Sequence, residues 1–414
     1  MTARTSTTAA ALQGIRVLDM TRVVAGPYAA QILGDLGAEV VKIERPGEGD
    51  DVRRVGPPWM KDADGRDTDT STYFQTTNRN KRSITIDFHQ PEGMQLIREM
   101  ALQADVLIEN YRTGTLARHG LGYDDLKAIN PRLIYCSVTG FGQTGPYAGY
   151  SGYDYIAQAM SGLMSVTGAR DGEPGAGPTR VGVPIADAST GLYAVIAVLA
   201  ALNHRHTHGV GQCIDVSLFD AQLSVMLNAF SAWFNAGVEL GRTGNDHPSA
   251  APYGLYQASD GHLLIATFND REFARLARLV DHPEWAEDSR FARNRERVAN
   301  RAQLATLLGE VLGRRTRAEW CERLNTGQVS CGPVNSMADL ARDPQVLARE
   351  LVVELQHPVT GRSASAASPM RLSETPVSYR LAPPQMGEHT REVLRSWLKL
   401  DDAAIAQLQQ KNVV

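Results

Sequence analysis

The sequence predicts an α/β protein built on a largely parallel sheet. Two observations support this fold class. Apolar runs of strand length alternate with segments of helical length through the first half of the chain, and parallel strands need such helical crossovers. The 414 residues are 43% hydrophobic and 21% charged, which is typical of a globular protein, and they suffice for two domains.

The predicted elements of the first half follow one another without long gaps. Buried strands, each dominated by apolar residues, are expected at residues 15–20, 38–44, 106–109 and 133–138. Helices are expected between them, at residues 28–36, 92–103 and 124–129. This order predicts a Rossmann-like unit, in which ligands bind at the carboxyl ends of the strands.

The composition changes after a long helix expected at residues 218–236. A polar loop at 241–249 precedes a predicted hairpin at 253–266 and further helices. The domain prediction therefore has four parts: a flexible tail at 1–12, a large Rossmann-like domain at 13–240, a smaller α+β domain at 241–330, and a return of residues 331–414 to the large domain.

Asp187 lies at a junction that suits a reactive group. Residues 181–186 read as a β-like run, and a long apolar segment of helical composition follows Asp187. Backbone N–H groups and the helix dipole can hold an anion there or stabilise a forming oxyanion. From these residues alone a second reading stays open, in which Asp187 only N-caps the helix.

Four other patterns contain residues that could form a functional site. The His-rich run 204–208 suggests either a metal site or cations at a helix C-terminus. Residues 78–82, NRNKR, could bind phosphate or form a solvated turn. Residues 140–145 spell GxGxxG, but Pro146 and a loop follow instead of a helix, which argues against NAD or FAD. His389 is interpreted as structural.

Charge, cysteines and hydropathy exclude several classes. A net charge of −4 gives no general attraction to nucleic acid or an anionic membrane. The four cysteines lie far apart without CxxC pairs, which indicates structural thiols in a reducing compartment, so we expect a cytoplasmic protein. The longest strongly apolar run, residues 192–202, is shorter than the roughly 18 residues that a membrane span needs.

Short segments along nearly the whole chain match one known family in the same order. They are residues 19–27 (DMTRVVAGP), 34–45 (GDLGAEVVKIER), 80–83 (NKRS), 109–111 (ENY), 120–123 (GLGY), 152–154 (GYD), the Asp187 junction, 331–334 (CGPV) and 387–390 (GEHT). On these segments the chain resembles the class III coenzyme A transferases, the CaiB/BaiF family. Residues 142–146 and 161–164 make it most similar to succinyl-CoA:dicarboxylate members.

The resemblance implies a ring-shaped subunit in an interlocked homodimer and a covalent mechanism. The aspartate at the position of Asp187 attacks an acyl-CoA thioester, and CoA then passes to a carboxylic acid through anhydride and thioester intermediates. An ordinary Asp has a pKa of about 3.9, so we expect Asp187 to be ionised at pH 7 without a general base. The loop 241–249 is our candidate cover against water.

The resemblance also implies a set of CoA contacts. They are Val24, Ala25, Arg45, Ile86, Asp87, Phe88, His89, Asn110, Tyr111, Arg112, Arg118, Ser151, Gly152, Tyr153 and Asp154. CoA thioesters and small carboxylic acids are the expected partners, with no tightly bound cofactor and no metal. Arg22, Arg79 and Arg180 are candidates for binding the far carboxylate of the acceptor.

Three alternatives remain beside the dicarboxylate transferase. Formyl-CoA or acetyl-CoA:oxalate transfer belongs to the same family, although Val24 stands where the formyl-CoA enzymes carry Gln. The related α-methylacyl-CoA racemases use a His near the position of Tyr153, and tyrosine, with a pKa of about 10, is a poor base at neutral pH. A non-catalytic CoA-binding protein would not need Asp187.

Overall fold

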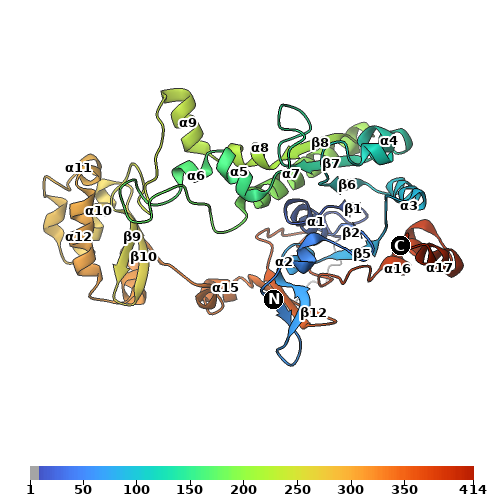
Figure 1. The fold of residues 1–414 in the computed structure, drawn as a ribbon. Helices are drawn as coiled ribbons and strands as arrows, with labels where there is room; N and C mark the ends of the chain where they lie inside the picture. The colour runs from blue at the N-terminus through green and yellow to red at the C-terminus, as the bar shows by residue number, and fades with distance from the viewer. Residues whose placement is uncertain (1–8) are drawn as a thin grey trace. The chain divides into compact units, whose positions relative to one another are not determined.

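The computed structural model describes residues 9–414 and divides into two compact units (Figure 1). The first unit contains the chain up to Leu163, Val181–Asn235 and Ala348–Val414, and the second contains Met164–Arg180 and Ala236–Leu347. The second unit thus includes the region predicted as the small domain, together with residues 164–180, 236–240 and 331–347. The predicted return to the large domain at residue 331 is wrong in its start: the chain rejoins the first unit at Ala348, because β11 pairs with β10 in the second unit. Residues 1–8 of the predicted tail lie outside the described part, whereas Leu12 is buried in the first unit's core.

A six-stranded parallel sheet forms the centre of the first unit. Its strand order is β5-β2-β1-β6-β7-β8, and each neighbouring pair is parallel. The strands are β1 (Arg16–Met20), β2 (Glu39–Glu44), β5 (Lys81–Thr85), β6 (Val106–Glu109), β7 (Ile134–Thr139) and β8 (Cys213–Ser217). The order reverses between β1 and β6, as in Rossmann-type sheets, and this confirms the predicted α/β class with a parallel sheet.

Helices cover both faces of this sheet. Alternate residues of β1 point to opposite layers: Val17 packs in one core and Leu18 in the other. The first core lies under α1 (Ala25–Asp35) and α7 (Ile185–His208), and the second under α3 (Pro91–Ala101), α4 (Tyr123–Ile129) and α16 (Thr390–Leu398). The small alanines and glycines of α1 and α7 let these two helices approach closely.

The second unit has a three-stranded antiparallel sheet. Its order is β11-β10-β9, and the β9–β10 hairpin turns through two residues after Ala258, as predicted. These strands are β9 (Tyr253–Ala258), β10 (Gly261–Ala266) and β11 (Ser330–Pro333). A third core, with Trp320 and Phe273 at its centre, joins this sheet to α10 (Asp270–Leu279), α12 (Arg301–Leu312) and α13 (Arg317–Thr326).

The remaining elements are short. In the first unit they are η1 (Asp51–Arg54), β3 (Trp59–Lys61), β4 (Asp67–Ser71), α2 (Thr72–Gln75), η2 (Ala117–His119), α5 (Asp154–Met160), α8 (Leu218–Ser224), α9 (Leu227–Ala236), β12 (Val352–His357), β13 (Gly361–Ala366) and α17 (Asp402–Gln410). The others are α6 (Leu163–Val166), η3 (Pro283–Ala286), α11 (Asn294–Ala299), α14 (Met337–Leu340) and α15 (Pro344–Ala348).

Three sequence predictions about elements are wrong. Residues 181–184 form no strand, and the helix already begins at Ile185. The predicted helix 218–236 is broken into α8 and α9, with Leu227 at a positive φ of 37°. Residues 78–82 are neither a solvated turn nor an open anion site, because Asn78 to Lys81 are buried and Lys81 opens β5.

Helix α7 is longer than its apolar run suggested. It has 24 residues with a mean hydropathy of 1.8 over its most apolar window, so by length and composition it could span a membrane. The prediction that no segment is long enough is therefore wrong. Half of that window is buried inside the protein, where α7 packs on α1 and on the sheet.

The C-terminal segment packs on one face of the central sheet, whose first strands lie near the N-terminus. Trp397 of α16 is buried in the second core and donates its indole N–H to Glu39 at 2.8 Å. Asp87 N–H donates to the carbonyl of Val413 at 2.8 Å, just after β5. In Figure 1, α16 and α17 accordingly lie at the β5 side of the sheet, next to α3.

Candidate active site

A cavity of about 260 Å³ opens at the carboxyl ends of β1, β6 and β7. This edge of a parallel sheet is where the loops after several strands converge, so it suits a nucleotide-like ligand. Ten of the predicted site residues line the cavity: Val24, Ala25, Asn110, Tyr111, Arg112, Ser151, Gly152, Tyr153, Asp154 and Asp187. The sequence prediction missed other lining residues, such as Asp51, Thr139 and Tyr150.

The other predicted contacts lie outside this cavity. Phe88 and His89 are stacked, and Phe88 also meets the ring of Tyr111 edge-on at 5.3 Å, so Tyr111 connects this aromatic group to the cavity. Ile86 is buried, and Asp87 accepts hydrogen bonds from His89. Arg45 pairs with Glu48 at the surface and Arg118 is exposed, so each keeps a guanidinium in reach of an external phosphate.

Asp187 lies in the first turn of α7 with a side chain that is 9% exposed. The N-cap of this helix is Pro184, and no side chain of that cap accepts a hydrogen bond. The carboxylate that caps α7 comes instead from α5: Asp154 Oδ1 accepts from the N–H groups of Ala186 at 2.7 Å and Asp187 at 3.1 Å. The N-cap interpretation of Asp187 is therefore wrong, because its carboxylate does not cap α7.

Asp154 is itself held from two sides. Its Oδ2 accepts from Gln158 Nε2 at 2.6 Å, one turn along α5. The other end of the same amide, Gln158 Oε1, accepts from the N–H of Val181 at 2.9 Å. Asp154 and Gln158 thus fix the segment that enters α7, and the start of α7 fixes Asp187.

The surroundings of Asp187 raise its pKa to about 7. Burial makes the largest contribution, the negative charge of Asp154 adds to it, and the backbone N–H of Ala25 acts against it by donating to the carboxylate. The expectation of an ordinary, fully ionised aspartate at pH 7 is therefore wrong. A pKa near neutral pH is typical of functional sites, where burial and neighbouring charges shift ionisation.

Two glycines allow the close approaches that build the cavity. Asp187 and Gly191 lie one turn apart on the same face of α7. A Cβ on Gly191 would lie 2.8 Å from the carbonyl oxygen of Ala25, so only glycine lets α7 reach the start of α1. Likewise a Cβ on Gly140 would lie 2.4 Å from Cα of Gly152.

We expect Gly191→Ala to lower kcat/KM by about tenfold or more, because the added methyl pushes Asp187 away from the Ala25 N–H. Steady-state kinetics with an acyl-CoA donor measures this effect. Gly309→Ala is the matched control, since it is also a helix glycine but has open space at its Cβ. The control should keep full activity, and equal activity in both variants would contradict the prediction.

The three arginines suggested for the acceptor differ in their surroundings. Arg22 lines the cavity, lies over the ring of Tyr111 and pairs with Asp51 at 3.1 Å. Arg79 is buried and forms a two-bond ion pair with Asp35, so it is structural and the prediction for it is wrong. Arg180 belongs to the second unit.

The two other histidine hypotheses are also placed by the structure. The run from His204 to His208 forms the last turn of α7, and Gly209 ends the helix with a φ of 77°. The predicted position of this run at a helix C-terminus is confirmed. His389 is the N-cap residue of α16, and its backbone N–H donates to the carbonyl of Ser83.

The fold and the cavity define an α/β protein with a buried, titrating carboxylate at the nucleotide-binding edge of a parallel sheet. Comparison with known proteins gives the family: a model of CoA-transferase family III matches residues 12–390, and the chain belongs to this family. The resemblance found in the sequence is thereby confirmed.

Similar proteins of known name are CoA-transferases. The succinate–glutarate CoA-transferase of Agrobacterium fabrum is 43% identical over 383 residues, which cover 92% of this chain and 94% of that protein. The succinyl-CoA:glutarate CoA-transferase of Homo sapiens is 40% identical over 403 residues, 97% of this chain and 90% of that protein. A crystal structure of a CAIB/BAIF family protein from Brucella suis has a TM-score of 0.84 and 42% identity, covering 94% of this chain and all of that one.

Proposed function

We propose that this protein transfers CoA from succinyl-CoA to a dicarboxylic acid of the glutarate class. The single observation that carries this proposal is the buried Asp187 in the cavity, held by the Ala25 N–H and next to the aromatic and arginine side chains suited to CoA. The substrates named for the similar transferases supply the donor and the acceptor class.

The proposed chemistry runs through Asp187 in two exchanges. Its ionised carboxylate attacks the thioester carbonyl of succinyl-CoA, and the C–S bond breaks to give a succinyl–aspartyl anhydride and CoA thiolate. The thiolate then attacks the carbonyl of Asp187, which releases succinate and leaves an aspartyl–CoA thioester. The acceptor's carboxylate reverses both steps: it displaces the thiolate to form a new anhydride, and the thiolate takes the acceptor's acyl group and frees Asp187.

The protein's own groups fit these steps. The pKa of about 7 keeps a large fraction of Asp187 ionised near neutral pH without a histidine base. Asp154 holds the first turn of α7 while bonds to Asp187 form and break. Burial excludes water from the anhydride, which would otherwise hydrolyse.

Trapping with hydroxylamine tests the proposal directly. The protein is mixed with succinyl-CoA, quenched with hydroxylamine and mapped by peptide mass spectrometry. We expect a hydroxamate on Asp187 that requires the acyl-CoA, because hydroxylamine attacks an activated aspartyl carbonyl. Acetyl-CoA and formyl-CoA are run beside it, and stronger labelling by either would change the donor. No label with any donor would overturn the mechanism.

We further propose that the active form is the interlocked homodimer that the family resemblance implies. Helices α7 and α9 expose large apolar side chains: Ile196 is 60%, Trp233 54% and Phe234 68% exposed. Large apolar side chains exposed in this number are expected to be covered by a second copy. Light scattering on serial dilution should give a dimer mass throughout. A mass that falls to the monomer at low concentration would contradict the interlocked arrangement.

A further inference from the structure

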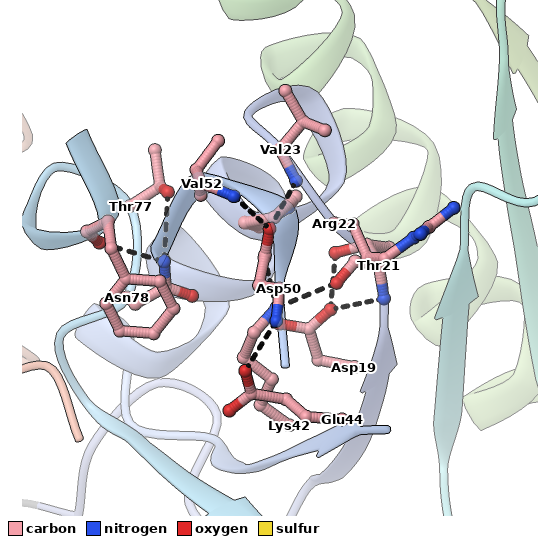
Figure 2. Close-up of polar contacts among 12 residues, drawn as sticks. Asp19, Thr21, Arg22, Val23, Lys42, Glu44, Asp50, Val52, Thr77 and Asn78 are labelled. Carbon is pink, nitrogen blue, oxygen red and sulfur yellow. Dashed lines mark hydrogen bonds and ion pairs between the residues drawn. The ribbon is translucent and has the colours of Figure 1, made fainter. Parts of the chain in front are cut away.

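Side chains from other elements hold the backbone of the loop between β1 and α1, and Figure 2 shows the contacts at Thr21 and Val23. Thr21 donates its N–H to Asp19 at 3.0 Å, and its carbonyl accepts from Lys42 Nζ at 2.7 Å. Arg22 is clamped by one side chain, since its N–H donates to Asn110 Oδ1 at 2.9 Å and its carbonyl accepts from Asn110 Nδ2 at 2.7 Å. Because so many of its backbone groups are hydrogen-bonded, this loop has a single conformation in the folded protein.

Val23 is the strained residue of this loop. Its φ is 71°, in the left-handed region that a β-branched residue rarely adopts. The N–H of Val23 donates to Asp50 Oδ1 at 3.0 Å, and the same oxygen accepts from Val52 N–H at 3.2 Å. The strain therefore persists because a buried carboxylate holds the residue from the next strand's loop.

Asp50 is in turn fixed by buried charges. Its Oδ2 lies 2.8 Å from Lys42 Nζ, and neither side chain is exposed. Its N–H donates to Glu44 Oε2 at 2.9 Å. Lys42 thus connects Asp50 to the start of the loop, because its ammonium binds both Asp50 and the carbonyl of Thr21 (Figure 2).

We propose that Asp50, held by Lys42, is a positioning residue for the catalytic carboxylate: it keeps Val23 left-handed and thereby fixes Val24 and Ala25, which line the same cavity as Asp187. The inference rests on the proposed function in that it takes Asp187 as the acyl acceptor. Neither Asp50 nor Lys42 lines the cavity, so their effect on the reaction must pass through the loop. Val24 and Ala25, which do line it, follow the strained residue directly.

The test compares the full-length protein with Asp50→Asn, Val23→Gly and the double variant. In Asp50→Asn we expect kcat to fall roughly 10- to 100-fold with little change in KM for succinyl-CoA. The acid limb of kcat/KM should move up by about half a pH unit or more, because the Ala25 N–H no longer lowers the pKa of Asp187. Adding Val23→Gly should restore part of kcat, since glycine adopts this φ without strain.

Two further variants separate positioning from simple destabilisation. Asp35→Asn breaks the buried pair with Arg79 at the far end of α1, and it should lower the melting temperature without moving the acid limb. If Asp50→Asn does not fold, Lys42→Met/Asp50→Ala removes both buried charges together and should give the same shifted limb.

The outcomes distinguish this inference from the proposed function. Wild-type protein that forms no hydroxamate on Asp187 refutes the function and leaves the positioning role without a target. A second outcome overturns the positioning role alone. In it the wild-type protein is labelled normally, and the Asp50 variant folds but has an unchanged kcat and an unchanged acid limb. A shift of the same size in Asp35→Asn would also overturn it, because the effect would then belong to any lost buried pair.

Discussion

Replacing Asp187 by Asn should lower CoA transfer by about 10³-fold or more, because a carboxamide cannot form the anhydride on which both exchanges depend. Glutaryl-CoA formed from succinyl-CoA and glutarate, measured by chromatography, gives the rate. The hydroxamate label should disappear from the same peptide. A variant that keeps more than a tenth of the wild-type rate would show that Asp187 is not the acyl acceptor.

The same variant should be more stable than the wild type at neutral pH. In the unfolded chain Asp187 ionises near its ordinary pKa of 3.8, but in the folded protein it ionises near 7. The folded state therefore binds the extra proton between these values, and its stability falls as the pH rises through this window. The wild type loses about 4 kcal/mol at most in its free energy of unfolding, and the Asn variant does not. Thermal unfolding from pH 4 to 8 measures the growing difference and confirms that the variant is folded.

The pH dependence of kcat/KM is the second large effect that the structure predicts. Only the ionised Asp187 attacks, so activity should be half-maximal near pH 7 and fall about tenfold per pH unit below pH 6. Asp154 and Tyr73 lie beside it, and the pKa of Tyr73 is raised by burial and by Asp187, which keeps that phenol neutral in this range. Half-maximal activity near pH 4 would contradict the pKa of about 7 that burial and the charge of Asp154 give Asp187.

Asp154→Asn is the control that assigns this limb. An asparagine keeps an oxygen that can accept from Ala186 and Asp187 but removes the charge that raises the pKa of Asp187. The acid limb should therefore move to lower pH, which is opposite to the shift expected for Asp50→Asn. A limb that moves up, or stays, would mean that Asp154 acts only as a helix cap.

Most of the central sheet could be predicted from the sequence, because β1, β2, β6 and β7 are the apolar runs expected at these positions. Strand β5 was missed: its sequence KRSIT looks like a surface segment. Its charges are satisfied only in the folded protein, where Lys81 lies 2.8 Å from Asp19 and Arg82 pairs with Glu39. Partners from distant parts of the chain override local propensity here.

The candidate site was predicted in its composition but not in its electrostatics. Asp187 and the other predicted residues that the resemblance implies make up half of the cavity lining. The effect of its neighbours on Asp187 could not be predicted, since Asp154 and Ala25 lie 33 and 162 residues away in sequence and reach it only through tertiary packing. The role of Asp50 was missed for the same reason, because a positive φ at a valine leaves no trace in the sequence.

The way the chain returns to its first sheet has a consequence for its synthesis. Trp397 and Val413 pack on one face of the sheet, and three of its strands, β1, β2 and β5, come from the first 85 residues. A ribosome adds roughly 5 to 20 residues per second, so about 15 to 60 s pass between the synthesis of β5 and that of Trp397. During that time α3 and α4 cover part of this face, and the part that α16 covers stays exposed. We therefore expect the growing chain to bind chaperones that recognise exposed apolar segments until α16 has been made.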